Sequence, residues 1–263
     1  NSAEVAEALF NEPGGKTSQN IKNLIGILEL AGREEDALQR IEEWKTLSPG
    51  SIAPWTQEAD LLYRLDRGDE AIAQLRKAAS QFSDEKDLQL KLAKLHDNLD
   101  DPAEATRIYW NLYEDTEEPS LRLRRVSDLF DIASYGGTVS ELIEEFEGRR
   151  QSNRTSPDPL LALAKIHELD NDREAQISSL VAASRLIPED INLLHQIAGV
   201  QLEEDLWEES IATLSTAARL DSSPRSKQRI ARSEIEYGDP EKGYLLLTDL
   251  ASELSDANQS LAN

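Results

Sequence analysis

The stretch Trp55–Ala79, WTQEADLLYRLDRGDEAIAQLRKAA, carries the pattern that decides the fold. Apolar and small residues recur at helical spacing in its first half, a polar turn follows, and a second apolar run opens on Ala71. Residues three and four positions apart share one face of a helix. The stretch therefore predicts two short helices joined by a tight turn, and we expect Trp55 to be buried against its neighbours.

The same pattern returns at 34-residue steps on both sides of this stretch. Five sets of positions keep the step: Ile25, Ala59 and Ala93; Leu28, Leu62 and His96; Ala37, Ala71 and Ala105; Ile41, Leu75 and Tyr109; and Trp44, Ala78 and Leu112. A period of 20 to 50 residues indicates stacked structural units rather than one globular core. The first half of the chain is thus predicted to be a repeat array.

The second half continues the array with a change of phase. A more divergent unit holds Val126, Phe130, Val139, Ile143 and Phe146, with Val139 in the place of the repeated Ala, and the segment 147–159 (EGRRQSNRTSPDP) is predicted to reset the phase. The next unit carries Leu160, Ala164, His167, Leu180, Ala183 and Pro188. Adding 34 gives Leu194, Ala198, Gln201, Leu214, Ala217 and Ser222. A last unit, about one residue out of step, runs through Ile230, Ala231, Gly243, Leu247 and Leu250.

Each unit is predicted to contain two helices. Apolar residues recur at helical spacing in each half, as in Leu88, Leu92, Leu95 and Leu99. The segments 100–104 (DDPAE) and 239–242 (DPEK) place Asp before a Pro at the first helical position, and 138–141 (TVSE) is a capping box. No segment alternates with period two, so the chain is predicted to be all-α.

The predicted organisation follows from these helix pairs. Residues 1–17 form the end of a preceding helix pair and a linker, residues 18–153 form four units, residues 154–254 form three, and residues 255–263 form a tail.

Helix pairs of 34 residues resemble tetratricopeptide repeats. The residues that match the family pattern are Trp55, Ala59, Leu62, Ala71, Leu75 and Ala78, with Pro49 and Pro188 where units end. Val139 and Gln176 stand where the family has a small residue. The resemblance covers residues 18–254 and implies a right-handed α-solenoid of about seven antiparallel helix pairs. It also implies a concave groove, lined by the first helix of each unit, that binds an extended peptide or a partner helix.

Composition narrows the classes of partner. The chain has 28 Lys and Arg against 51 Asp and Glu, a net charge of −23, which repels the phosphate backbone of nucleic acids. No apolar run approaches the ~20 residues of a membrane helix, so direct membrane insertion is not expected. The absence of Cys excludes disulfides and thiolate catalysis. A Cys-free chain suits a reducing cytoplasm and a periplasm alike, and we expect a bacterial protein in one of these compartments.

No constellation of residues indicates catalysis. His96 and His167 occupy the same repeat position, which predicts packing between helices, and His195 is expected on the concave side. No two His are spaced as metal ligands. The segment 14–17 (GGKT) resembles the end of a phosphate-binding loop, but Phe10 stands where that loop needs Gly, so it is interpreted as a linker. No enzyme activity, cofactor or metal is expected.

The resemblance implies a set of groove positions on the first helices. They are Lys22, Gly26, Thr56, Asp60, Tyr63, Arg64, Lys94, Asn98, Arg124, Asp128, Lys165, His195, Gln228 and Arg232. Six of them form a basic line in an acidic protein: Lys22, Arg64, Lys94, Arg124, Lys165 and Arg232. Either these cations pair with neighbouring Asp60, Asp87, Asp97 and Asp128, or they bind the carboxylates of an acidic peptide.

Two functions remain open from the sequence. The carboxylate clamp of chaperone-binding family members is broken here, because Gly26, Gln57 and Asp87 replace the residues it needs beside Lys22 and Lys91. The first function is a non-enzymatic scaffold that binds a protein or peptide in the groove. The alternative is a structural spacer in a bacterial envelope or polysaccharide-export assembly, where the repeats set a distance and the ends dock.

Overall fold

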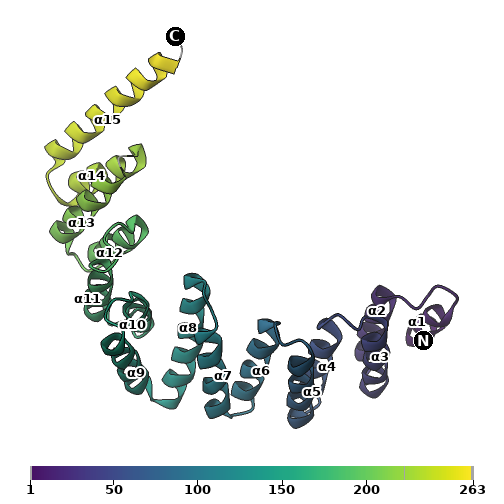
Figure 1. Ribbon diagram of the computed structural model, residues 1–263. Coiled ribbons are helices and arrows are strands. Elements are labelled where there is room, and N and C mark those ends of the chain that lie inside the picture. The colour runs from purple at the N-terminus through teal and green to yellow at the C-terminus, as the bar shows by residue number, and fades with distance from the viewer. Residues whose placement is uncertain (1, 222, 262–263) are drawn as a thin grey trace. The chain divides into compact units, whose positions relative to one another are not determined.

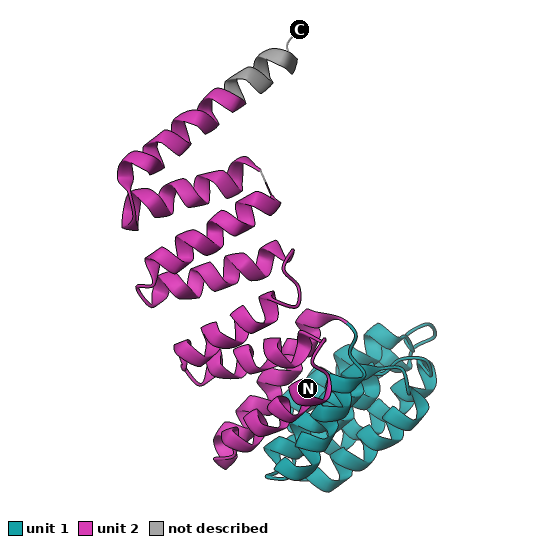
Figure 2. Cartoon of the chain, turned by 60° about the vertical axis from the view of Figure 1, so that its left-hand side comes forward, with its two compact units in different colours: residues 1–117 teal, residues 118–263 magenta. Residues whose placement is uncertain are grey.

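The computed structural model describes residues 2–221 and 223–261, with side chains as far as residue 253. Within these residues the chain forms fifteen helices and no strand (Figure 1). They divide into two compact units, residues 1–117 and 118–263 (Figure 2). The predicted all-α class is therefore correct.

Each unit is a stack of antiparallel helix pairs. Unit 1 contains α1 (Ser2–Asn11), α2 (Ser18–Leu30), α3 (Glu34–Leu47), α4 (Ala53–Arg64), α5 (Gly68–Gln81), α6 (Lys86–Asn98) and α7 (Pro102–Glu114). Unit 2 contains α8 (Pro119–Gly136), α9 (Val139–Ser152), α10 (Asp158–Leu169), α11 (Arg173–Ser184), α12 (Ile191–Glu203), α13 (Trp207–Leu220), α14 (Pro224–Tyr237) and α15 (Pro240–Leu261). The even-numbered helices are the first helices of the pairs, and the odd-numbered helices from α3 to α15 are the second.

One turn recurs between the two helices of successive pairs. A residue with positive φ ends the first helix at Gly32, Asp66, Asp100, Gly137, Asn171 and Asp205. The backbone N–H that follows it donates to a carbonyl five residues upstream, as from Arg33 to Leu28 and from Asp172 to His167, both at 2.9 Å. This is a Schellman motif, in which a left-handed residue closes the helix end. Gly, Asn and Asp are the residues that adopt this conformation at least cost.

These turns relocate the predicted change of phase. Successive turn residues lie 34 residues apart except between Asp100 and Gly137, which are separated by 37. The three extra residues fall within α8, which is the longer helix, with 18 residues against 13 in α6. The residue five positions after each turn residue is buried, as Ala105 is after Asp100. Leu142, which lies five positions after Gly137, is therefore the counterpart of Ala105, and Val139 is not.

The prediction that residues 147–159 reset the phase is therefore wrong. Three residues are close to one helical turn, so the longer α8 keeps its apolar face in nearly the same direction. That leaves almost no trace of the insertion in the apolar pattern, and the sequence alone placed it too late.

The repeated positions form the core of each unit. Ala37, Ala71 and Ala105 are fully buried where the second helix crosses the first. Gln176 and Ser210 occupy the same position in unit 2 and are also buried. Their polar atoms are satisfied, because Ser210 Oγ donates to the Ala198 carbonyl at 2.8 Å and Gln176 Oε1 accepts from Arg173 at 2.8 Å.

Two of the three predicted helix starts have the expected cap. Asp101 accepts from the backbone N–H of Glu104, and Asp239 accepts from those of Glu241 and Lys242. The capping box at Thr138 is wrong, since its side chain makes no capping bond. Thr138 has ψ 26°, away from the extended backbone that aims an N-cap side chain at the helix, because its own N–H closes the preceding turn on Ala133.

Some predicted features lie at the margin of the structure. Ser222, 262 and 263 fall outside the described residues, and the predicted tail overlaps α15, which ends at Leu261. The grouping into four and three pairs stays a prediction, while the compact units divide at residue 117. Searching the described helices finds none with the length and apolarity to cross a bilayer. The described side chains likewise contain no cluster of three potential His, Asp or Glu metal ligands.

Candidate protein-binding surface

In unit 1 the predicted groove residues lie on the exposed face of α2, α4 and α6. The exposed ones are Lys22, Asp60, Tyr63, Arg64, Lys94 and Asn98, while Gly26 and Thr56 are half-buried. They share this face because their spacing within each helix is three or four residues. The apolar residues of the same helices point to the opposite side and form the core.

Ion pairs between successive first helices cover part of this face. Arg64 on α4 donates to Glu29 on α2 at 2.6 Å, and Lys91 on α6 donates to Asp60 on α4 at 2.6 Å. Gln57 also donates to Glu29, at 3.2 Å. The basic line is thus partly tied to carboxylates, although Arg64 uses Glu29 rather than a predicted Asp. Such exposed pairs contribute about 0–1 kcal/mol each.

In unit 2 the predicted residues have weaker local partners. Lys165 on α10 pairs with Glu168 at 3.2 Å, and Arg232 on α14 pairs with Glu236 at 3.7 Å, in both cases within one helix. Asp128 is half-buried and lies 3.2 Å from Arg125. Gln228 is exposed. Arg124 is exposed and has no ion pair among the described residues.

A cavity of about 370 Å³ opens beside Arg124 and Lys165. Its walls come from α8, α10 and α12, three successive first helices, with Leu180 of α11 at its base. The lining residues are Ser120, Leu123, Arg124, Ser127, Leu161, Lys165, Glu168, Leu180 and Gln196. Sequence reasoning missed Ser120, Ser127 and Gln196. Ser120 and Ser127 were detectable in principle, because each lies one helical turn from Arg124.

His195 precedes the cavity residue Gln196 in the sequence, but its side chain lies toward α14 rather than in the cavity. It is half-buried on α12, and Nδ1 is a buried atom without a hydrogen-bond partner in the described structure. Burial lowers the pKa of His195, and the positive charges of Arg229 and Arg225 on α14 lower it further, with Asp221 opposing them in part. The imidazole is therefore neutral near pH 7, and it is poorly suited to bind an anion.

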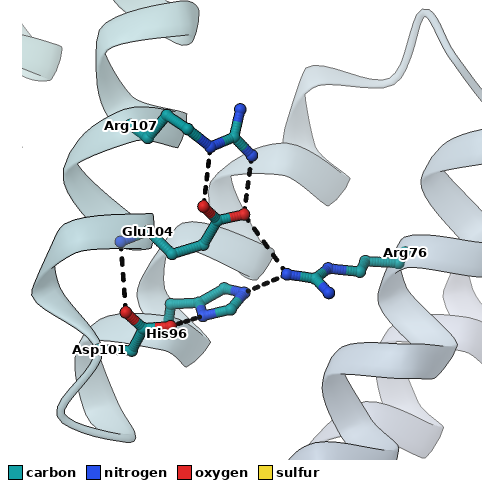
Figure 3. Close-up of polar contacts among 5 residues, drawn as sticks. All are labelled: Arg76, His96, Asp101, Glu104 and Arg107. Atoms are coloured by element: carbon teal, nitrogen blue, oxygen red, sulfur yellow. Dashed lines mark hydrogen bonds and ion pairs between the residues drawn. The ribbon is translucent and has the colours of Figure 1, made fainter.

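His96 belongs to a closed polar network in unit 1 (Figure 3). It is buried, as predicted, and its Nδ1 lies 2.9 Å from Asp101 Oδ2 while its Nε2 lies 3.4 Å from Arg76 Nη2. Arg76 can only donate, so this arrangement places the ring proton on Nδ1. Glu104 accepts two bonds from Arg107, at 2.8 and 2.7 Å, and these hold its pKa at about 2. The network links α5, α6 and α7 and leaves His96 no open face.

Trp55 is a packing residue with an electrostatic role that the pattern did not reveal. It is buried, as expected, and the Lys45 ammonium lies 4.0 Å from the centre of its ring. Lys45 also binds Glu58 at 2.5 Å, and both side chains of this ion pair are buried. Burial outweighs the attraction of Lys45 and raises the pKa of Glu58.

A combination of features shared by the six pairs from α2–α3 to α12–α13 identifies the repeat. Their turns recur at 34 residues with one step of 37, a left-handed residue closes each first helix, and a buried position, most often Ala, follows five residues later. The fold is that of tetratricopeptide repeats. The predicted groove residues of both units lie on the first helices of this repeat, which are α2, α4 and α6 in unit 1 and α8, α10, α12 and α14 in unit 2.

No family model matches this chain, and no curated protein sequence does. Solved structures of tetratricopeptide-repeat proteins resemble it at low identity. A tetratricopeptide repeat protein from Parabacteroides merdae is 13% identical, with 90% of this chain and 93% of that chain covered at a TM-score of 0.41. PilF from Pseudomonas aeruginosa is 14% identical, with 87% and 98% covered at 0.40.

The TPR2AB domain of yeast Sti1, in a complex with pHSP90, is 15% identical to this chain. The match covers 93% of each chain at a TM-score of 0.38.

Proposed function

We propose that this protein is a non-enzymatic scaffold that binds an extended acidic segment of a partner protein on the first-helix face of unit 2. The observation that supports this function most directly is the 370 Å³ cavity between α8, α10 and α12. It contains two cations, Arg124 and Lys165, that the repeat pattern had placed on the binding face. Two further predicted residues, Gln228 and Arg232, are exposed on α14 and are proposed to extend the contact along that helix.

The lining of the cavity matches an acidic peptide better than a neutral one. Arg124 lacks a carboxylate among the described residues, and a guanidinium binds a carboxylate through two parallel hydrogen bonds. Lys165 has only the half-buried Glu168 of its own helix, a surface pair that a partner carboxylate can replace at a cost of about 1 kcal/mol or less.

Neutral groups in the cavity provide the rest of the contact. The hydroxyls of Ser120 and Ser127 and the amide of Gln196 can bind peptide backbone groups. Leu123, Leu161 and Leu180 provide an apolar base for a side chain. The bound segment is therefore proposed to alternate acidic and apolar residues.

Charge reversal at the cavity tests the proposal. An array of acidic peptides would select a ligand, and fluorescence anisotropy would then compare the unaltered protein with Arg124→Glu, Lys165→Glu and the double variant. We expect each single variant to weaken binding about tenfold or more, since each loses a charge-assisted bond and gains a repulsion. Arg219→Glu is the matched control, because Arg219 is exposed on α13, a second helix that contributes neither to the cavity nor to the first-helix face.

Unchanged affinity in the double variant would exclude this surface as the binding site. The spacer function then becomes testable by deleting the α10–α11 pair, residues 158–184. A spacer requires that this deletion disturb the assembly in cells while Arg124→Glu and Lys165→Glu leave it intact.

A further inference from the structure

A second cavity in unit 2 lies on another part of the surface and is not used by the proposed peptide site. It has a volume of about 560 Å³ and is bounded by the end of α9, the loop that follows, α10 and the end of α11. Three arginines line it: Arg150 on α9, Arg154 in the loop, and Arg185 at the end of α11. We call this cavity the arginine notch.

The arginine notch has an excess of positive charge in an acidic chain. Arg150 contacts the neighbouring Glu147, with both oxygens at 3.2 Å. Arg154 and Arg185 contact no carboxylate within the described part of the chain. Three guanidinium groups and one carboxylate leave a local charge of +2, whereas the whole chain carries −23.

The equivalent cavity in unit 1 shows that the repeat does not require these arginines. Counterparts in the two units differ by 71 residues, which is one step of 34 and one of 37. Ala79, Ser83 and Glu114 stand at the places of Arg150, Arg154 and Arg185. That cavity, of about 740 Å³, is lined by two cations, Lys86 and Arg107, and two carboxylates, Asp84 and Asp115, so its charged side chains cancel.

Helix dipoles do not explain the arginines either. A cation at a helix C-terminus is favourable, and α9 and α11 both end at the notch. However, α5 and α7 end in the same way at the unit 1 cavity with Ala79 and Glu114 in those places. The three arginines are therefore a local feature of unit 2.

We propose that the arginine notch binds a phosphate monoester dianion on a carrier with an apolar group. A charge of +2 matches a dianion, and planar guanidiniums bind phosphate oxygens through paired hydrogen bonds. The volume exceeds that of a phosphate group, and Leu160, Ala182 and Leu186 give the remaining space an apolar wall. The notch contains no aromatic ring on which a base stacks, and the surrounding negative charge disfavours a polyanion such as nucleic acid.

Calorimetric titration of the full chain tests the site with defined probes. The first probe is a tripeptide with phosphoserine between two leucines, and its unphosphorylated twin is the ligand control. Glycerol phosphate and inorganic phosphate are the small-molecule probes. We expect the phosphopeptide to bind and the twin to show no binding at millimolar concentration. If the phosphopeptide binds more tightly than glycerol phosphate, the phosphate is carried by a peptide. If the two bind equally, the ligand is a small phosphate ester.

Matched variants locate the binding. Arg154→Gln and Arg185→Gln should each lower the affinity about tenfold or more, because each removes charge-assisted bonds to the dianion. Arg219→Gln is the control. Arg219 is the counterpart of Arg185 in the next helix pair, where Pro188 takes the place of Arg154, so the second arginine is missing there. It should bind the phosphopeptide like the unaltered protein. Circular dichroism checks that the exposed substitutions leave the helices intact.

Acidification provides an independent readout. The second pKa of a phosphate monoester is about 6, so the ligand becomes a monoanion below that pH, and binding should weaken several-fold between pH 7.5 and pH 5. Equal binding of the phosphopeptide and its twin, or unchanged binding in Arg154→Gln and Arg185→Gln together, would overturn the proposal. Because Arg124 and Lys165 line a different cavity, the peptide site can fail without affecting this result.

Discussion

In unit 1, Arg64 and Lys91 on the first helices reach carboxylates on the preceding first helix, whereas in unit 2 Arg124, Arg154 and Arg185 line cavities without such partners. The ladder in unit 1 consists of Arg64 with Glu29 and Lys91 with Asp60. Both units use the same helix pair, so repeat position alone does not make a cation available to a ligand. Whether a cation is available depends on the residue that faces it from the neighbouring first helix, about one repeat away in the sequence.

A buried ion pair distinguishes one helix pair of unit 1 from the others. Glu58 occupies a core position at which five other pairs have a buried apolar residue: Leu24, Leu92, Leu129, Leu163 and Ile197. Its charge is balanced there by Lys45. A buried pair of this kind is often no more stabilising than apolar residues, while loss of one partner is costly.

The largest expected effect is at this pair. Lys45→Met should destabilise the fold by about 3–5 kcal/mol, because it leaves Glu58 buried without a cation. The double variant Lys45→Met, Glu58→Leu restores the residue type of the other repeats and should regain this loss or exceed the original stability. Urea denaturation followed by circular dichroism measures the free energies of unfolding. If the double variant were as unstable as the single one, the buried charge would not be the cause.

The pH dependence of Lys45→Met has a definite sign. Burial already raises the pKa of Glu58, and removing the cation raises it further. A carboxyl with a raised folded pKa destabilises the fold when ionised and ceases to do so when protonated. Lys45→Met should therefore regain stability relative to the unaltered protein as the pH falls from 7 toward 5.

A smaller effect on stability is expected at Gly137, in the turn that follows the lengthened helix α8. Gly137→Ala should cost about 1–2 kcal/mol, because its φ of 70° is unfavourable for a residue with a Cβ atom. Asn171→Gly, at the same position one pair later, should change stability by about 0.5 kcal/mol or less, since both residues tolerate this conformation. Thermal unfolding compares the two. An equally small effect at Gly137 would mean that the turn in this pair is not left-handed.

The smallest expected effect concerns the closed network of unit 1. The Arg107 guanidinium holds the pKa of Glu104 at about 2, below its value of 4.5 in an unfolded chain. The stability that Glu104 contributes is thus present above pH 4.5 and is lost as the pH falls toward 2. Glu104→Gln should lower stability at pH 7 by about 1 kcal/mol or less after solvent screening, and it should flatten the acid loss. Urea titrations at pH 7, 4 and 3 check this, and parallel curves for the two proteins would contradict it.

Much of the architecture was predictable from the sequence. The 34-residue period, the buried residues Ala37, Ala71 and Ala105, and the packing roles of Trp55 and His96 all follow from helical periodicity. Burial on one face of a helix is a property of residues three and four apart, so it is written in the local sequence.

Tertiary structure decided which residues meet across helices. The three residues added to α8 preserve the apolar face because they are close to one turn, so only the backbone of the turn at Gly137 revealed them. The pairing of Arg64 with Glu29, the burial of Glu58 against Lys45 and the gathering of Arg150, Arg154 and Arg185 join residues from separate helices. Such contacts depend on how neighbouring helices pack side by side. The sequence by itself determined the repeat and its core, and packing between repeats decided which charges are neutralised and which remain open.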